Sequence, residues 1–399
     1  MNTIYDELLF YMENLPVIST HSHHMNVIDS GGLDLDALLR NSYVNWCGVP
    51  FDETLASRRD FLDKVRYNSY FIWLQKSLQA IYHMDEPLTA ENWDVFSNKI
   101  REANKDTGKH IELLKSVCRY EKIILDAYWD PGSNNGYPEL FTPAFRVNMF
   151  FFGYSPEVED HSGKNALRIY NKEIKDIDEY VAFMRYAIQE KKQLGCVALK
   201  SAIAYDRGLD FTEATKDQAQ KALGCKGHMA DTDDIKAFQD YIFFQVCKIA
   251  AEFDLPFQCH TGLGKLEKSN AMWLQEAIVK NPDTKFVLFH CSYPWLDDVN
   301  GLLHLYPNVY PDLCWLPLIS TSAAVRMLHE LIEVGTIDKI CWGCDTWTSE
   351  ESYGALLAIR QVLADVLTDK INAGYLNLND ALVIADNLLL KNARKLYKL

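Results

Sequence analysis

Short apolar runs of strand length alternate along the chain with longer stretches of helical periodicity. We identify eight such runs, at residues 16–24, 122–129, 145–154, 196–205, 256–262, 285–292, 309–317 and 339–347. The runs are nearly continuous rather than alternating, which is typical of strands buried on both faces of a parallel sheet. Between the fourth and fifth runs, one helix face is marked by Phe238, Ile242, Val246, Ile249 and Phe253. Strand and helix alternating about eight times predict the α/β class and a (β/α)8 TIM barrel. A doubly wound open sheet with an added helical domain is the alternative.

Residues 33–118 break this alternation. They separate the first two runs by far more than one crossover helix requires, and their pattern is mostly helical and aromatic. We therefore predict one barrel domain over residues 1–399, with a helical insertion after the first strand, at residues 33–118, packed over the barrel mouth. A smaller excursion, residues 206–234, follows the fourth run. We find no short-period repeat or Pro/Gly/Ser linker that marks a domain boundary.

Composition narrows the class of partner. The chain has 48% hydrophobic and 24% charged residues, as expected of a globular protein with a large core, and a formal charge of −15. An acidic chain lacks the basic patch that phosphate backbones and anionic membranes require, so we expect neither nucleic acid nor membrane as a partner. Acidic residues interrupt the N-terminal apolar stretch, which is therefore unlike a signal peptide. The ten cysteines are scattered singly along the chain, so we expect reduced thiols rather than disulfides. We expect a cytoplasmic enzyme for a small molecule, with a homo-oligomer left open.

Metal-competent side chains end five of the eight apolar runs. They are His21 and His23, Lys200, His260, His290 and Asp345. In a barrel, the carboxyl ends of the strands and the loops after them form the active face. His21 and His23 are two positions apart on a strand and point to the same side, whereas His24 points away and is expected to be structural. One histidine at a strand end is usually a hydrogen-bonded core residue, but five such ends favour a site for zinc, manganese or iron.

Other polar and aromatic residues near the strand ends are candidates for the substrate pocket. Tyr205 and Arg207 follow the Lys200 strand, and an arginine there could bind a substrate carboxylate through two hydrogen bonds; a solvated loop arginine is the alternative. Trp295 and Trp347 could line a flat pocket or pack in the core. The two cysteines of the CWGCD stretch have CxxC spacing, but they fall inside a predicted strand, so we expect buried thiols beside Asp345.

The ordered motifs THSHH, KSAIAY, CHTG, FHCSYP and GCDTW, with the tail LLKNARKLY, resemble those of the amidohydrolase superfamily. Its members are metal-dependent hydrolases on a TIM barrel, and the tail resembles the closing helix of the amidohydrolase-related branch. The resemblance implies that His21, His23, His260 and Asp345 bind the more buried metal. Asp345 would also take the proton of the metal-bound water. His290 resembles either a ligand of a second metal or a neutral electrophile that polarises the substrate carbonyl.

Lys200 decides between one and two ions. A carbamylated lysine would be a bridging carboxylate between two metals, whereas an ordinary ammonium would be repelled by the ion and would pair with an anionic substrate. Many members of the decarboxylase-like branch lack this lysine and use one metal. Its presence here favours the binuclear arrangement, with a plain lysine paired to a nearby carboxylate as the alternative.

Three enzymatic functions follow from this pattern. The leading one is a metal-dependent hydrolase that cleaves a C–N or C–O bond of a small substrate, including one that bears a carboxylate, through a metal-bound hydroxide. In that reaction Asp345 would accept the water proton and deliver it to the leaving group. The alternatives are a mononuclear non-oxidative decarboxylase and a uronate-isomerase-like enzyme. The resemblance to the uronate isomerases lies in the helical insertion after the first strand. The complete ligand set disfavours a non-catalytic binding module.

Overall fold

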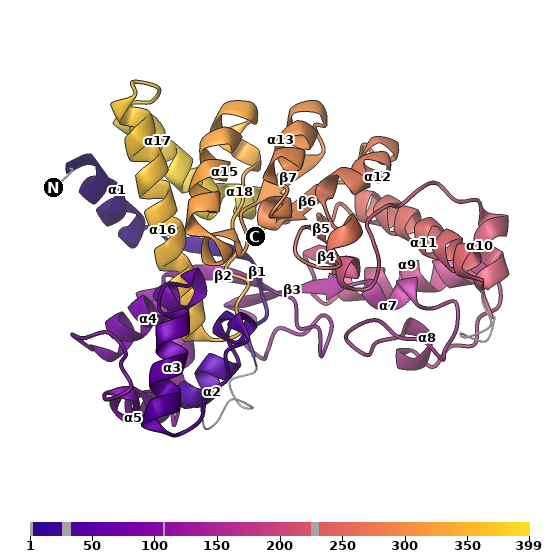
Figure 1. The fold of residues 1–399 in the computed structure, drawn as a ribbon. Coiled ribbons are helices and arrows are strands. Elements are labelled where there is room, and N and C mark those ends of the chain that lie inside the picture. Colours follow the sequence, from indigo (N-terminus) through magenta and orange to yellow (C-terminus); the bar gives the residue numbers. More distant parts are fainter. Residues whose placement is uncertain (1–2, 26–32, 107, 225–230) are drawn as a thin grey trace.

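The computed structural model describes residues 3–25, 33–106, 108–224 and 231–399. In these residues, seven parallel strands form one curled sheet whose order follows the sequence (Figure 1). The strands are β1 (Val17–Ser22), β2 (Tyr120–Leu125), β3 (Phe141–Arg146), β4 (Ala198–Ser201), β5 (Phe257–His260), β6 (Phe286–Phe289) and β7 (Val309–Asp312). Nearly every strand residue is buried, because helices cover the outside of the sheet. The predicted α/β class is confirmed, and the curled sheet is TIM-barrel-like.

The eighth predicted run, residues 339–347, forms only an isolated bridge between Cys341 and Asp312 rather than a regular strand. Its backbone nevertheless bonds to segments on both sides. The hydrogen bonds are Cys341 N to Pro311 O (3.0 Å), Leu313 N to Cys341 O (2.9 Å), Thr20 N to Trp342 O (3.1 Å) and Asp345 N to His21 O (3.0 Å). This segment therefore joins the end of β7 to β1 and places Asp345 next to the first strand.

The third predicted strand was wrong in its boundaries. The strand ends at Arg146, and residues 148–151 form a short helix, α7 (Asn148–Phe151), instead of continuing the strand. A continuous apolar run has no periodicity that separates a strand from a buried helix. Tertiary contacts decide it here, because Asn148 accepts a hydrogen bond from Ala202 N (2.7 Å) and the hydroxyl of Tyr180 donates to Phe150 O (2.8 Å).

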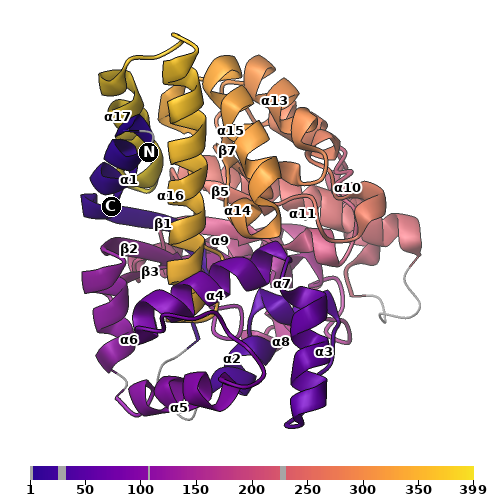
Figure 2. The same cartoon turned by 60° about the vertical axis from the view of Figure 1, so that its left-hand side comes forward.

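Between β1 and β2 the described chain is mostly helical. Its helices are α2 (Leu35–Arg40), α3 (Leu55–Val65), α4 (Ser69–Tyr82), α5 (Trp93–Ala103) and α6 (Gly108–Glu112), with one-turn segments at Tyr43–Cys47 and Leu113–Val117. Residue 107 of the predicted 33–118 segment lies outside the described residues. These helices have their own hydrophobic cluster, around Phe61, Trp93 and Phe96. They gather at one end of α16 (Ser349–Asn372), which α4 crosses (Figure 2).

The remaining helices surround the sheet. They are α1 (Thr3–Asn14), α8 (Ala166–Ile169), α9 (Ile177–Gln193), α10 (Lys216–Ala222), α11 (Thr232–Glu252), α12 (Gln275–Lys280), α13 (Leu296–Leu305), α14 (Leu316–Ile319), α15 (Thr321–Val334), α17 (Leu378–Asp386) and α18 (Asn392–Tyr397). The predicted apolar face of α11 is buried at Phe238, Ile242 and Val246. No helix in the described part of the chain is long and apolar enough to cross a membrane.

The contact between residues 341–345 and β1 is tight at Gly343. A Cβ added there would lie 2.7 Å from His21 N and 2.7 Å from Thr20 Oγ1. We expect Gly343→Ala to lower the free energy of unfolding by about 2 kcal/mol, because β1 must move to make room. The matched control is Gly301→Ala on α13, because the Cβ added there meets no neighbouring atom within 4 Å. We expect this variant to be as stable as the wild type or more stable by about 0.5 kcal/mol. Urea denaturation measures both, and equal stability of the two variants would contradict the tight contact.

Candidate active site

The end of β1 carries two histidines whose ring nitrogens approach one carboxylate. Nδ1–H of His23 donates to the backbone oxygen of Asp126 (2.8 Å), which leaves Nε2 free, 3.2 Å from Oδ1 of Asp345. Nε2 of His21 lies 3.7 Å from the same oxygen. His21 is fully buried, and neither of its ring nitrogens has a hydrogen-bond partner among the described residues. Buried polar atoms are normally hydrogen-bonded, so this arrangement is one that a bound cation would complete.

The histidines of the fifth and sixth strand ends form a second pair. Nε2–H of His260 donates to Leu263 O (2.5 Å), and Nδ1–H of His290 donates to Cys314 O (2.8 Å), since a carbonyl can only accept. The remaining nitrogens, Nδ1 of His260 and Nε2 of His290, face each other at 3.1 Å. Burial lowers the pKa of His260 well below its usual value and that of His290 to about 4, so both rings are neutral. Two lone pairs at this distance are stabilised by a cation between or beside them.

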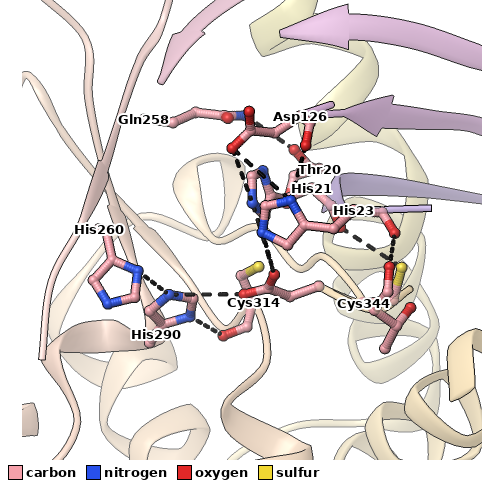
Figure 3. A network of polar contacts seen from close by, with 12 residues as sticks. Thr20, His21, His23, Asp126, Gln258, His260, His290, Cys314 and Cys344 are labelled. Carbon is pink, nitrogen blue, oxygen red and sulfur yellow. Dashed lines mark hydrogen bonds and ion pairs between the residues drawn. The ribbon is translucent and has the colours of Figure 1, made fainter. Parts of the chain in front are cut away.

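Figure 3 shows the two pairs, His21 with His23 and His260 with His290. Asp345 connects them, because its Oδ1 faces the β1 histidines while Oδ2 lies 3.8 Å from Nε2 of His290. Two groups of potential ligand atoms each fall within 4.8 Å of one another: those of His21, His23 and Asp126, and those of His290, Cys314 and Asp345. Neutral imidazoles and carboxylates are suitable donors for a divalent transition metal. The residues present therefore fit a metal centre at the carboxyl ends of the strands.

Lys200 ends β4 beside these groups. Its side chain is buried, and its Nζ lies 3.9 Å from the centre of the Phe289 ring. Among the described residues, Nζ of Lys200 has neither a hydrogen-bond partner nor a carboxylate within ion-pair distance. Burial lowers the pKa of this lysine to about 8, even though Asp345 and Asp126 act in the opposite direction. The amine is thus far more easily deprotonated than an ordinary lysine.

Two charged residues at this site were not predicted from the sequence. Asp126 directly follows β2, and Arg146 is the last residue of β3; they form a buried ion pair in which Arg146 Nε and Nη2 donate to the carboxylate at 3.0 Å and 2.6 Å. Both lie at strand ends, which is the signal that could have found them. Arg146 was missed because the predicted third strand began at residue 145, which placed the arginine at the wrong end.

A cavity of about 270 Å³ opens beside the candidate ligands. Its lining combines aromatic rings with basic side chains. The rings are those of Tyr43, Trp46, Tyr128, Tyr205 and Trp347, and the basic side chains are those of Arg146, His161 and Lys200. Two of the predicted substrate residues are thus in place: the Trp347 ring stacks on His23 at 5.7 Å between centroids, and the Tyr205 ring lies 4.3 Å from that of His260. The volume suits a small molecule.

The structure does not bring Arg207 or Trp295 to this cavity. Nη1 of Arg207 donates to Asp240 (2.9 Å), and its guanidinium lines a different surface depression together with Asp210. Trp295 lies at the start of α13, where its backbone N–H donates to Ser292 O (2.8 Å). The arginine in the lining of this cavity is Arg146.

A family model described as Amidohydrolase matches residues 135–399, which is more than half of the chain. The chain belongs to the amidohydrolase family. This membership shows an enzyme of the metal-dependent amidohydrolase superfamily, as the ordered motifs predicted. The family match begins after β1, so the His21 and His23 motif lies outside it.

Similar proteins include the fluG protein of Emericella nidulans, 29% identical over 221 residues, or 51% of this chain and 26% of that protein. The chain thus spans about a quarter of the length of that relative. Among solved structures, a uronate isomerase from Thermotoga maritima has a TM-score of 0.78 at 16% identity, covering 100% of this chain and 98% of that one. A metal-dependent hydrolase from Lactobacillus casei has a TM-score of 0.73 at 16% identity, covering 98% and 97%. These likenesses show that the shared fold extends over nearly the whole chain.

Three substitutions test the candidate ligands. We expect His21→Ala, His23→Ala and Asp345→Asn each to remove the bound metal from the purified protein, because each deletes a donor atom. Metal content by elemental analysis is the measurement. The matched control is His24→Asn, since Nε2 of the adjacent His24 bonds to Ser352 Oγ (2.7 Å) instead of facing the cavity. That variant should keep its metal and lose only stability, and full metal content in any of the first three would reject that residue as a ligand.

Proposed function

We propose that this amidohydrolase cleaves a C–N or C–O bond of a small substrate that bears a carboxylate, with zinc as the preferred metal and manganese or iron as alternatives. One observation carries the proposal: ring nitrogens of the buried His21 and His23 both face Asp345, and those of His21 have no hydrogen-bond partner among the described residues. Next to them lies a cavity lined by Arg146 and Lys200. A divalent ion in this position would lower the pKa of a bound water and polarise the substrate carbonyl. The site requires a polar substrate small enough for the cavity.

The protein residues would do the rest of the chemistry. Asp345, the carboxylate nearest to both histidine pairs, would accept the proton of the attacking water. Arg146 would bind the substrate carboxylate through Nη1, because Nε and Nη2 are already bonded to Asp126. Its Nη1 makes long contacts to described residues, of 3.3 Å to Ser162 Oγ and 3.4 Å to His161 Nε2, and an anion could replace them. Tyr205 and Trp347 would pack against the substrate and exclude water.

We further propose that residues 33–118 are an insertion in a single barrel domain and that they shape the substrate pocket. Tyr43 and Trp46 of this segment line the cavity. The Tyr43 ring stacks on Trp315 at 4.5 Å, and Trp315 contacts the His290 ring at 5.1 Å. Through this stack, packing in the helical segment is coupled to a candidate metal ligand.

A uronate isomerase is the second candidate. It is supported by the TM-score of 0.78 to the Thermotoga maritima enzyme over the whole chain, including the helices that follow β1. A one-metal decarboxylase is the third. The test is a product screen of the metal-loaded protein with N-acyl amino acids, aromatic carboxylic acids and uronates. Release of an amine or alcohol supports hydrolysis, release of CO₂ supports decarboxylation, and a ketose–aldose interconversion supports isomerisation.

Substrate carboxylate recognition can be tested within that screen. We expect Arg146→Lys to raise KM at least tenfold for a carboxylate substrate. The single ammonium nitrogen of lysine cannot replace both the nitrogens that bind Asp126 and the separate Nη1 that faces the cavity. The KM for the methyl ester of the same substrate should change much less. Arg207→Lys is the control and should leave both KM values unchanged, since Arg207 is bonded to Asp240 outside the cavity. A raised KM in Arg207→Lys with an unchanged KM in Arg146→Lys would show that Arg207 binds the substrate carboxylate.

We propose that Lys200 is carbamylated and that the site then holds two ions, with His290 as a ligand of the second. The proposal is supported by a buried amine without a carboxylate partner beside several candidate ligands. We expect intact-mass analysis in bicarbonate buffer to show about 44 Da of added mass that Lys200→Met abolishes, together with two metal ions per chain. One tightly bound ion and an unmodified lysine would contradict the bridge and favour the decarboxylase.

A further inference from the structure

A histidine and an aspartate that have no role in the metal centre form a hydrogen-bonded pair at the wall of the cavity. His161 lies in the loop between α7 and α8, and Asp206 follows the one-turn segment Ile203–Tyr205. Oδ2 of Asp206 accepts Nδ1–H of His161 (2.8 Å), and Oδ1 accepts the backbone N–H of the same residue (2.8 Å). The carboxylate thus holds the histidine at two points and leaves Nε2 on the opposite side of the ring.

Asp206 is itself held in place. Its side chain is 9% exposed, and Oδ2 also accepts a hydrogen bond from Nδ2 of Asn148 (3.2 Å). The oxygen of that same amide is bonded to the backbone N–H of Ala202 (2.7 Å). A buried carboxylate at Nδ1 fixes the tautomer of a neutral imidazole, with its lone pair on Nε2, and stabilises the imidazolium that forms when Nε2 takes a proton. The geometry is that of an oriented acid–base group.

His161 can exchange protons with water, unlike the candidate ligands. Its side chain is 28% exposed, against 1% for His21, 11% for His23 and 1% for His290. In the ligand-free cavity Nε2 accepts a long hydrogen bond from Arg146 Nη1 (3.4 Å). Protonation of Nε2 would require Nη1 to turn to its other contact, Ser162 Oγ (3.3 Å), or to a bound substrate carboxylate. Asp206 compensates the charge of the imidazolium, and Asp126 compensates that of the guanidinium.

The pair is also close to the reaction centre. The Tyr205 ring is in contact with both histidines, since its centre lies 5.1 Å from the ring of His161 and 4.3 Å from that of His260. His161, Tyr205 and His260 all line the same cavity. A substrate seated against Tyr205 would therefore contact Nε2 of His161 on one side and the candidate metal ligands on the other.

We propose that His161, oriented by Asp206, is the catalytic residue that donates the proton to the leaving group, an inference that rests on the proposed hydrolase function. When the C–N or C–O bond breaks, its electron pair stays on the leaving nitrogen or oxygen, which takes the proton from Nε2 of imidazolium His161. The attacking water supplies its oxygen to the carbonyl carbon. The water proton that is displaced passes to Asp345. Asp345 then releases it to solvent, and His161 is protonated again from solvent. Asp206 acts as a positioning residue.

The first experiment uses the hydrolysed substrate class found in the product screen. His161→Gln should keep the wild-type metal content and lower kcat about 10²-fold or more, the usual contribution of a general acid. The loss should be large for an amide or alkyl ester and small for the matching p-nitrophenyl ester, whose leaving group needs no proton. Asp206→Asn should show the same dependence on the leaving group with a smaller loss. A purely structural role in holding the loop would lower both rates equally.

His329→Gln is the matched control. This histidine lies on α15, its side chain is 30% exposed, and Nε2 is 3.6 Å from a carboxylate oxygen of Asp369, so its exposure is close to that of His161. We expect wild-type kcat and metal content. An inactive wild-type protein would refute the proposed function, whereas an active wild type with an equally active His161→Gln variant would refute only the role of His161.

A second readout needs no substrate. Acylation of Nε2 by diethyl pyrocarbonate, followed at each histidine by peptide mass analysis, reports how nucleophilic the imidazole is. We expect His161 in the metal-loaded wild type to react several-fold faster than His329, and Asp206→Asn to remove this difference while His329 is unchanged. Equal rates at the two histidines, unaffected by Asp206→Asn, would overturn the proposal. Thermal unfolding of each variant checks that the fold is retained.

Discussion

The rest of the site depends on one buried carboxylate, that of Asp345, which is shared between two pairs of histidines. Its two oxygens face His21 and His23 on one side and His290 on the other. Burying a carboxylate costs solvation energy that hydrogen bonds do not fully recover here, since among the described residues neither Oδ1 of Asp345 nor either ring nitrogen of His21 has a hydrogen-bond partner. A bound cation recovers it. The same arrangement therefore costs stability in the absence of metal and provides affinity for it.

Backbone hydrogen bonds and one buried side chain keep this carboxylate in position. Asp345 N donates to His21 O, and the segment that precedes it bonds to both β7 and β1. After it, Glu351 on α16 accepts the backbone N–H groups of Trp347 (3.2 Å) and Tyr43 (2.8 Å). Burial raises the pKa of Glu351 to about 8. One carboxyl group thus ties the loop after Asp345 to the helical segment that follows β1.

The two walls of the cavity differ in chemistry, and the difference is the basis for the assigned roles. One wall carries the candidate ligands, whose side chains are buried. The other carries Arg146 and His161, each held by an aspartate, Asp126 and Asp206 respectively. Asp126 binds Nε and Nη2 of Arg146 and leaves Nη1 at the cavity, and Asp206 binds Nδ1 of His161 and leaves Nε2 there. A carboxylate substrate bound by the free nitrogen of Arg146 would place its scissile bond between the two walls.

The sequence by itself determined the class, the order of the strands and the set of polar groups at their ends, because strand length, burial and side-chain alternation are local properties of the chain. His21 and His23 share a side for that reason, and parallel strands bring their ends to one edge whatever the details of packing.

The sequence could not decide where the third apolar run stops being a strand, and so it missed Arg146. It also placed Arg207 in the cavity, whereas Asp240, more than thirty positions later in the chain, holds that side chain elsewhere. The pairing of Asp206 with His161 across 45 positions likewise appeared only in the tertiary structure. Such choices depend on contacts between distant segments, which a local pattern does not contain.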